Sequence, residues 1–218
     1  MDKAELVEKL LGAAGRGDTK SVRALLDAGA NVNSKAMGAT ALMAAVGNGH
    51  NDTVRLLLDA GADVNAFVKI GKPRRATALM EAAYSGYADT VRALLNAGAD
   101  VNRGNSNHET ALMHAVRGRA YFEGDYGSII RLLLDAGADV DATDVYNWTA
   151  LMMAASYQVE DENEDNDMVS IVRLLLEAGA DVNVADESGE TALAKAVNSG
   201  STKIASLLRK HGAIVQTA

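Results

Sequence analysis

Residues that could carry out acid–base, nucleophilic or metal chemistry are few in this 218-residue chain. The four histidines, His50, His108, His114 and His211, occupy non-equivalent places, and no two have the spacing of paired metal ligands. Catalysis needs a base or nucleophile with an orienting partner. The chain also has no cysteine, which excludes thiolate ligands and nucleophiles. We therefore predict no enzyme activity, no catalytic residue, no metal site and no cofactor.

The densest cluster of charge is acidic, with six carboxylates among residues 160–167. Asp161, Asn163, Asp165 and Asp167 stand at every second position, as the calcium ligands do at the start of an EF-hand loop. However, Asn166 stands where that loop needs glycine, and Val172 stands where it needs glutamate. We therefore expect a solvated loop within a longer insertion, 158–168. Weak divalent-ion binding, or docking of a basic partner, stays open as an alternative.

A basic counterpart lies in residues 69–75, which contain Lys69, Lys72, Arg74 and Arg75 and no acid. Nucleic-acid binding needs many phosphate contacts, whereas the chain has a net charge of −8 and a pI near 5.0. We therefore predict no nucleic-acid partner. An acidic patch on a protein partner is a better match for this segment than nucleic acid is. A loop that only raises solubility is an equally good interpretation.

Two short sequence motifs recur along the chain, and they define the elements that must position the histidines and the charged segments. One is Thr-Ala-Leu, which starts at Thr40, Thr77, Thr110, Thr149 and Thr191. The other is Ala-Gly-Ala, with a decayed final copy, and its glycines are Gly29, Gly61, Gly98, Gly137, Gly179 and Gly212. The glycine spacings of 32, 37, 39, 42 and 33 residues fit a 33-residue unit with loop insertions.

Each unit has the pattern of two helices. Threonine is a favourable N-cap, and Leu42, Ala45 and Val46 follow Thr40 on one helical face. Val54 and Leu57 begin a second apolar face, and Gly61 then supplies a left-handed C-cap. We therefore predict a repeating helix, turn, helix, glycine stop and polar loop.

A two-helix unit that opens Thr-x-Leu and ends Gly-Ala-Asp-Val-Asn resembles the ankyrin repeat, from about Glu5 to Ala213. The resemblance implies an all-α fold, a helix-turn-helix repeat solenoid with short β-hairpin-like loops. The family's histidine after Thr-Pro-Leu is replaced by Met43, Met80, Met113 and Met152, which we expect to pack as apolar residues. A single domain, 1–218, would comprise an N-cap repeat 1–33, repeats 34–65, 66–102, 103–141 and 142–183, and a C-cap repeat 184–218.

The resemblance also implies a concave groove between the hairpin tips and the exposed side of each first helix. All nine aromatic residues lie between residues 67 and 157, outside the repeated apolar positions. Tyr, Trp and Arg are enriched at interface hot spots. For Phe67, Phe122 and Tyr126, packing within the enlarged loops is at least as good an interpretation. We expect partner contacts from repeats three to five at Arg74, Tyr84, Arg117, Tyr121, Tyr146, Trp148 and Tyr157.

The long insertions, about 119–128 and 158–168, occupy the same turn of adjacent repeats, so we expect them side by side. No secretory signal or membrane-spanning run is visible, and we expect a cytoplasmic monomer with no membrane partner. The expected function is a noncatalytic protein–protein interaction module, acting as an inhibitor, scaffold or adaptor. The alternatives are a small-molecule or divalent-ion receptor that uses insertion 158–168, and a host-directed effector.

Overall fold

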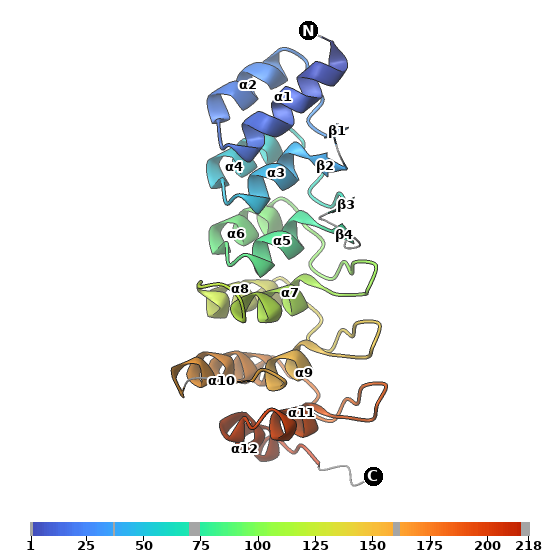
Figure 1. Ribbon diagram of the computed structural model, residues 1–218, viewed down its shortest axis with the longest axis vertical. Helices are drawn as coiled ribbons and strands as arrows, with labels where there is room; N and C mark the ends of the chain where they lie inside the picture. Colours follow the sequence, from blue (N-terminus) through green and yellow to red (C-terminus); the bar gives the residue numbers. More distant parts are fainter. Residues whose placement is uncertain (1, 37, 70–74, 159–161, 215–218) are drawn as a thin grey trace.

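The computed structural model describes residues 2–36, 38–69, 75–158 and 162–214. Helices pair with one another, and the pairs stack from the N-terminal to the C-terminal end of an elongated array (Figure 1). First helices form one column, second helices form another, and the loops that enter the first helices project to one side. The predicted all-α solenoid with short hairpin-like loops is confirmed.

The helices and strands have the following bounds. The first helices are α1 (Lys3–Gly15), α3 (Ala41–Gly47), α5 (Ala78–Tyr84), α7 (Ala111–Arg119), α9 (Ala150–Ala155) and α11 (Ala192–Asn198). The second helices are α2 (Thr19–Asp27), α4 (Asn51–Asp59), α6 (Ala88–Asn96), α8 (Tyr126–Asp135), α10 (Glu162–Glu177) and α12 (Thr202–Lys210). Two antiparallel hairpins pair β1 (Lys35–Ala36) with β2 (Ala39–Thr40) and β3 (Val68–Lys69) with β4 (Arg75–Ala76).

The first helices begin as predicted, with one exception. In four of the five Thr-Ala-Leu copies the threonine hydroxyl accepts the backbone N–H three residues on, for example Thr40 from Met43. Thr110 is the exception, because its hydroxyl is buried without a hydrogen-bond partner in the described structure. The glycine after each second helix takes a left-handed conformation, as at Gly137 with φ 86°.

The core is a continuous layer of aliphatic side chains between the two helix columns. The Thr-Ala-Leu leucines and the second-helix valine and leucine positions are almost fully buried, except for Leu25 in the first repeat, which is half-buried. Each repeat therefore buries its apolar faces against its neighbours, as solenoids require. The methionines Met43, Met80, Met113 and Met152 are buried as well, which confirms apolar packing at those positions.

A ladder of side-chain hydrogen bonds links successive repeats along the exposed loops after the second helices. Asn102 illustrates one rung: its amide nitrogen donates to Gly137 O at 2.9 Å, and its amide oxygen accepts Asp139 N–H at 2.7 Å. Asn33, Asn65 and Asn183 form the same pair of bonds. Asp141 makes only the accepting bond, from Asp181 N–H at 2.9 Å.

In repeats four to six, backbone hydrogen bonds join the loops that enter the first helices. Val145 N–H donates to Asn107 O at 3.0 Å, and Glu187 N–H donates to Tyr146 O at 3.3 Å. The loops of repeats four, five and six thus form a connected edge beside the column of first helices.

The acidic insertion differs from its prediction. We expected a solvated loop, but α10 starts at Glu162, so most of the acidic run is helical. Carboxylates in the first turns of a helix are favoured by the helix dipole, which explains why this composition extends α10 instead of forming a loop. Among the described residues, no helix combines the length and apolar character needed to cross a bilayer.

Candidate partner-binding groove

A hollow of about 330 Å³ lies where repeats four and five meet, between α7 and α9. It gathers four of the seven residues predicted to contact a partner: Arg117, Tyr121, Trp148 and Tyr157. Met153 and Ser156 contribute from α9 and its C-terminus, and Met168 contributes from α10. Residues from the hairpin, the first helices and the insertions therefore meet at one place.

The other predicted residues have different surroundings. The Tyr84 ring lies 6.3 Å from Tyr121 and 5.3 Å from Phe122 between ring centroids, so it extends the aromatic surface into repeat three. Tyr146 is 62% exposed on its hairpin and does not line the hollow. Arg74 lies outside the described residues.

Arg117 is held in place by a buried carboxylate. Its Nη1 donates to Glu109 Oε1 at 2.6 Å, and Asn105 Nδ2 donates to Glu109 Oε2 at 2.7 Å. His114 Nε2 lies 3.5 Å from the same oxygen, too far for a good hydrogen bond, and has no closer partner among the described residues. Burial by itself would raise the pKa of Glu109, but the contacts from His114, Asn105 and Arg117 outweigh it and lower that pKa well below its ordinary value.

Trp148 is positioned by a second ionic cluster, in repeat six. Lys195 Nζ lies 4.0 Å from the centre of the Trp148 ring, and it pairs with Asp186 at 2.7 Å and Glu190 at 2.9 Å. Burial alone would lower the pKa of Lys195, but the two carboxylates raise it, so the cation is retained. A cation over an indole face is attractive, so Trp148 is partly structural and not only a surface residue.

The two insertions do stand side by side, as predicted. Arg119 Nη2 pairs with Asp167 Oδ2 at 2.6 Å across them. Tyr126 is only 1% exposed, which agrees with the packing interpretation offered for it, although it lies outside the repeated apolar positions. Its hydroxyl donates to Tyr84 O at 2.8 Å, and burial raises the pKa of Tyr126 to about 12.

Phe67 also has a partner, since the Arg103 guanidinium lies 4.4 Å from its ring centre. His50 makes a structural contact, since its Nε2 lies 3.1 Å from Gly15 O in the preceding repeat. Within the described ranges, no group of three or more histidine and acidic residues could hold a metal ion. The acidic residues 160 and 161 fall outside those ranges.

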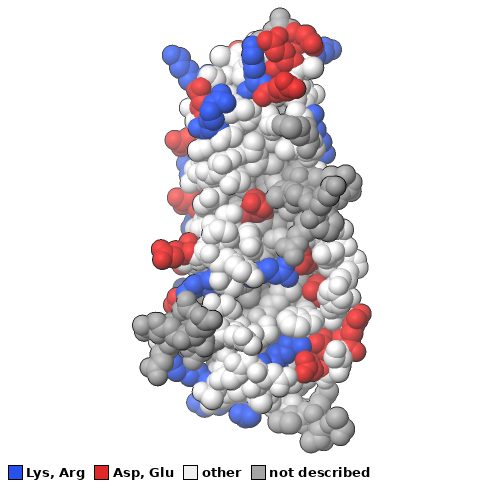
Figure 2. Space-filling model, viewed as in Figure 1, with Lys and Arg blue, Asp and Glu red and all other residues white. Residues whose placement is uncertain are grey.

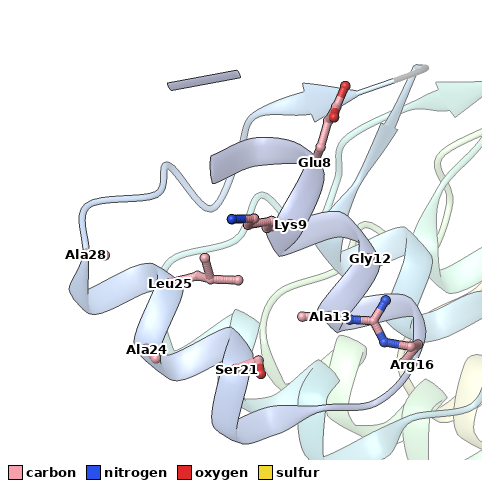
Figure 3. A pocket seen from close by; sticks show the side chains of 9 residues that line it. All are labelled: Glu8, Lys9, Gly12, Ala13, Arg16, Ser21, Ala24, Leu25 and Ala28. Atoms are coloured by element: carbon pink, nitrogen blue, oxygen red, sulfur yellow. The ribbon is translucent and has the colours of Figure 1, made fainter. Parts of the chain in front are cut away.

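The charged side chains of this face form separate patches over a largely uncharged surface (Figure 2). Acidic atoms gather beside the hairpins toward the C-terminal end. A larger hollow, about 730 Å³, lies on the N-terminal repeat between α1 and α2, with Leu25 and Lys9 directed toward it (Figure 3). It contains none of the predicted contact residues, so it is separate from the groove.

Sequence reasoning missed the two ionic clusters that support the groove. A signal was present, because Glu109 and Glu190 occupy the position just before the threonine, and a basic residue stands four residues after that threonine in both repeats, at His114 and Lys195. Equivalent positions in a stack lie on one surface, so this recurrence predicts a pairing of opposite charges.

Comparison with known proteins agrees with this architecture. The family model for ankyrin repeats matches residues 8–68, 66–144 and 118–218. The crystal structure of the ankyrin repeat protein EF0377 is 29% identical with a TM-score of 0.80, and the match covers 94% of this chain and 98% of that one. An ankyrin repeat domain from Acinetobacter baumannii AYE is 32% identical with a TM-score of 0.81, at the same coverages of 94% and 98%. No curated protein matches the chain.

Proposed function

Because the chain belongs to the ankyrin repeat family, we propose that it binds a protein partner along the groove of repeats three to five, without catalysis. Ankyrin repeat domains are generally protein-binding modules and typically noncatalytic. The observation that carries the proposal is the hollow between α7 and α9, where Arg117, Tyr121, Trp148 and Tyr157 converge. These residue types dominate binding energy at protein interfaces.

The rigidity of the hollow supports the same proposal. Arg117 is fixed by Glu109, and Trp148 is fixed by Lys195. Ordering a long side chain on binding costs about 0.5–1.5 kcal/mol. Side chains that are already ordered avoid much of that cost, so this groove is arranged for contact before a partner arrives. An inhibitor, a scaffold and an adaptor would all use such a surface.

The test is capture of a partner by wild-type protein and by two variants. Ser156→Trp fills the hollow without removing a core side chain, because Ser156 is only half-buried on its border. Tyr121→Ala removes a ring that is 69% exposed. We expect both variants to fold and to lose the captured protein. Tyr146→Ala, outside the hollow, shows whether the hairpin tips take part.

Melting temperatures close to wild type are required before a loss of binding is interpreted. Retention of the same partner by the folded Ser156→Trp variant would place binding elsewhere and contradict the proposal.

A further inference from the structure

The loops that enter repeats five and six are built alike around an aspartate. In repeat six, Asp186 Oδ1 accepts two backbone N–H groups of its own loop, at 2.8 and 3.0 Å. In repeat five, Asp144 Oδ1 accepts the equivalent two, at 2.8 and 2.9 Å. Each aspartate is 8% exposed. One carboxylate oxygen is therefore used by the loop itself in both repeats, and Oδ2 is left for another donor.

A lysine takes that remaining oxygen in repeat six. Lys195 Nζ lies 2.7 Å from Asp186 Oδ2 and 4.0 Å from the centre of the Trp148 ring. Lys195 stands four residues after the threonine cap of its helix, and Met153 holds that place in repeat five. Repeat five thus has the carboxylate without the lysine. Among the described residues, Asp144 Oδ2 has no hydrogen-bond or ion-pair partner.

This part of repeat five opens on the hollow between α7 and α9. Asp144, Trp148 and Met153 all line that hollow. The other charged residue in the described lining is Arg117, whose Nη1 pairs with Glu109 Oε1 at 2.6 Å. An incoming ammonium would therefore meet the charge of Asp144, while the charge of Arg117 is offset by Glu109.

Asp144 is two repeats away from the basic hairpin of residues 69–75. That hairpin belongs to repeat three, and the loop of repeat four stands between repeats three and five (Figure 1). Asn107 O in the loop of repeat four accepts Val145 N–H from the loop of Asp144. Residues 159–165, which follow Gln158 at the edge of the hollow, contain no lysine, arginine or histidine. The assignment of Asp144 therefore does not depend on either segment.

The geometry suits an ammonium better than a guanidinium. Arginine gains most from two parallel bonds to both oxygens of a carboxylate, whereas Oδ1 of Asp144 is already used by its loop. A lysine needs only Oδ2, as Lys195 does on Asp186. The hollow is about 330 Å³, roughly ten times the volume of a water molecule in the liquid. It has room for one lysine stem against Met153 and Met168.

We propose, on the basis of the protein-binding role, that the hollow receives a lysine side chain of the partner, whose ammonium lies between Asp144 Oδ2 and the Trp148 ring. The partner is a protein with an exposed lysine in the segment that crosses the groove. Tyr121, which is 69% exposed and borders the hollow, contacts the residues beside that lysine. An ammonium against an indole ring is attractive, and Lys195 provides the example within this chain.

Selection from a library of short random peptides tests the proposal. We expect wild-type protein to enrich peptides that contain lysine, and the Asp144→Asn variant to lose that enrichment. This variant should keep its loop, because Asn105 holds the same position in repeat four and its Oδ1 accepts the equivalent two N–H groups. Asp135→Asn, exposed at the end of α8 and outside the hollow, changes the net charge equally and should leave the selection unchanged.

A selected peptide then gives the strength of the contact. Acetylating its lysine removes the charge and keeps the stem, so binding to wild-type protein should weaken about tenfold. On Asp144→Asn the acetylated and unmodified peptides should bind equally. Met153→Lys puts an ammonium of the chain itself at the place that Lys195 holds in repeat six, so this variant should also lose the preference for the unmodified peptide.

The outcomes separate this inference from the general binding role. An unchanged lysine preference on folded Asp144→Asn, or equal enrichment of arginine peptides by wild-type protein, would overturn the proposal. Binding of the free diamine cadaverine as tightly as the peptide would assign the site to a small amine and overturn it too. Peptides without basic residues, displaced by Ser156→Trp, would overturn the lysine site and leave the groove as a binding surface. A library that yields no peptide sensitive to Ser156→Trp would contradict both.

Discussion

Asp141 breaks the ladder of hydrogen bonds between repeats, so Asp141→Asn should stabilise the protein. Asn33, Asn65, Asn102 and Asn183 each donate to a glycine carbonyl of the next repeat, at 2.9–3.4 Å. The carboxylate of Asp141 has no proton to donate to Gly179 O, although it keeps the accepting bond. A neutral hydrogen bond contributes about 0.5–1.5 kcal/mol, and this exposed rung should contribute ~0.5–1 kcal/mol.

The assay is urea unfolding followed by circular dichroism, with thermal melting beside it. For a chain of this size, ~1 kcal/mol corresponds to a rise of about 2–4 °C in Tm. Asn102→Asp removes the equivalent donor and should lower stability by a similar amount.

Asp135→Asn is the matched control, because Asp135 is an exposed acid and Asn96 holds the same repeat position. If Asp141→Asn were no more stable than Asp135→Asn, the gain would come from reduced charge, and the argument from the missing rung would fail.

Three further predictions concern the residues that support the groove. Tyr126→Phe should cost about 1 kcal/mol in unfolding free energy, because Tyr84 O loses its donor; an unchanged urea midpoint would contradict this. Trp148→Ala should cost about 2 kcal/mol, since the half-buried ring covers Lys195; a melt identical to wild type would show the ring to be only a surface group. Acid should lower the stability of the fold through Glu109. Folding lowers the pKa of this carboxyl group, so its contribution to the free energy of unfolding is present above the unfolded pKa near ~4.3 and is lost as the pH falls toward the folded pKa. Glu109→Gln should therefore lose less stability between pH ~5 and ~3 than wild type, and parallel Tm profiles would refute the assignment.

Features that recur in every repeat could be predicted from the sequence, because the same residue types at the same spacing form the same local structure in each copy. The threonine caps, the glycine stops and the buried methionines all recur, and all but Thr110 behave as expected. The same regularity identified Arg117, Trp148 and Tyr157 as residues of one surface. Whether they contact a partner stays a prediction.

The parts that could not be predicted lie where the repeat is interrupted. Tyr126 ends an insertion, and although packing was one interpretation of it, its contact with Tyr84 O was not predicted. Its equivalent is His50, which contacts the carbonyl of Gly15 in the preceding repeat. The acidic run resembled a loop by composition, whereas its place before a helix favours extension of that helix. Contacts between repeats, such as that of Lys195 with Trp148, depend on how far apart two neighbouring repeats lie in space. The number of residues between them in the sequence does not give that distance.

The backbone bonds between neighbouring hairpins make this edge tolerant of sequence change. Asn107 and Tyr146 contribute only their carbonyl groups to those bonds, and Val145 and Glu187 contribute only their N–H groups. Side chains at these tips can therefore be exchanged without loosening the connection, while Glu109 and Glu190, a few residues on, are committed to ion pairs. Asn105, Asp144 and Asp186 accept backbone N–H groups within the same loops and must also stay. Randomising only Asn107, Val145, Tyr146 and Glu187 would give a library of binders whose specificities differ and whose stability stays nearly constant.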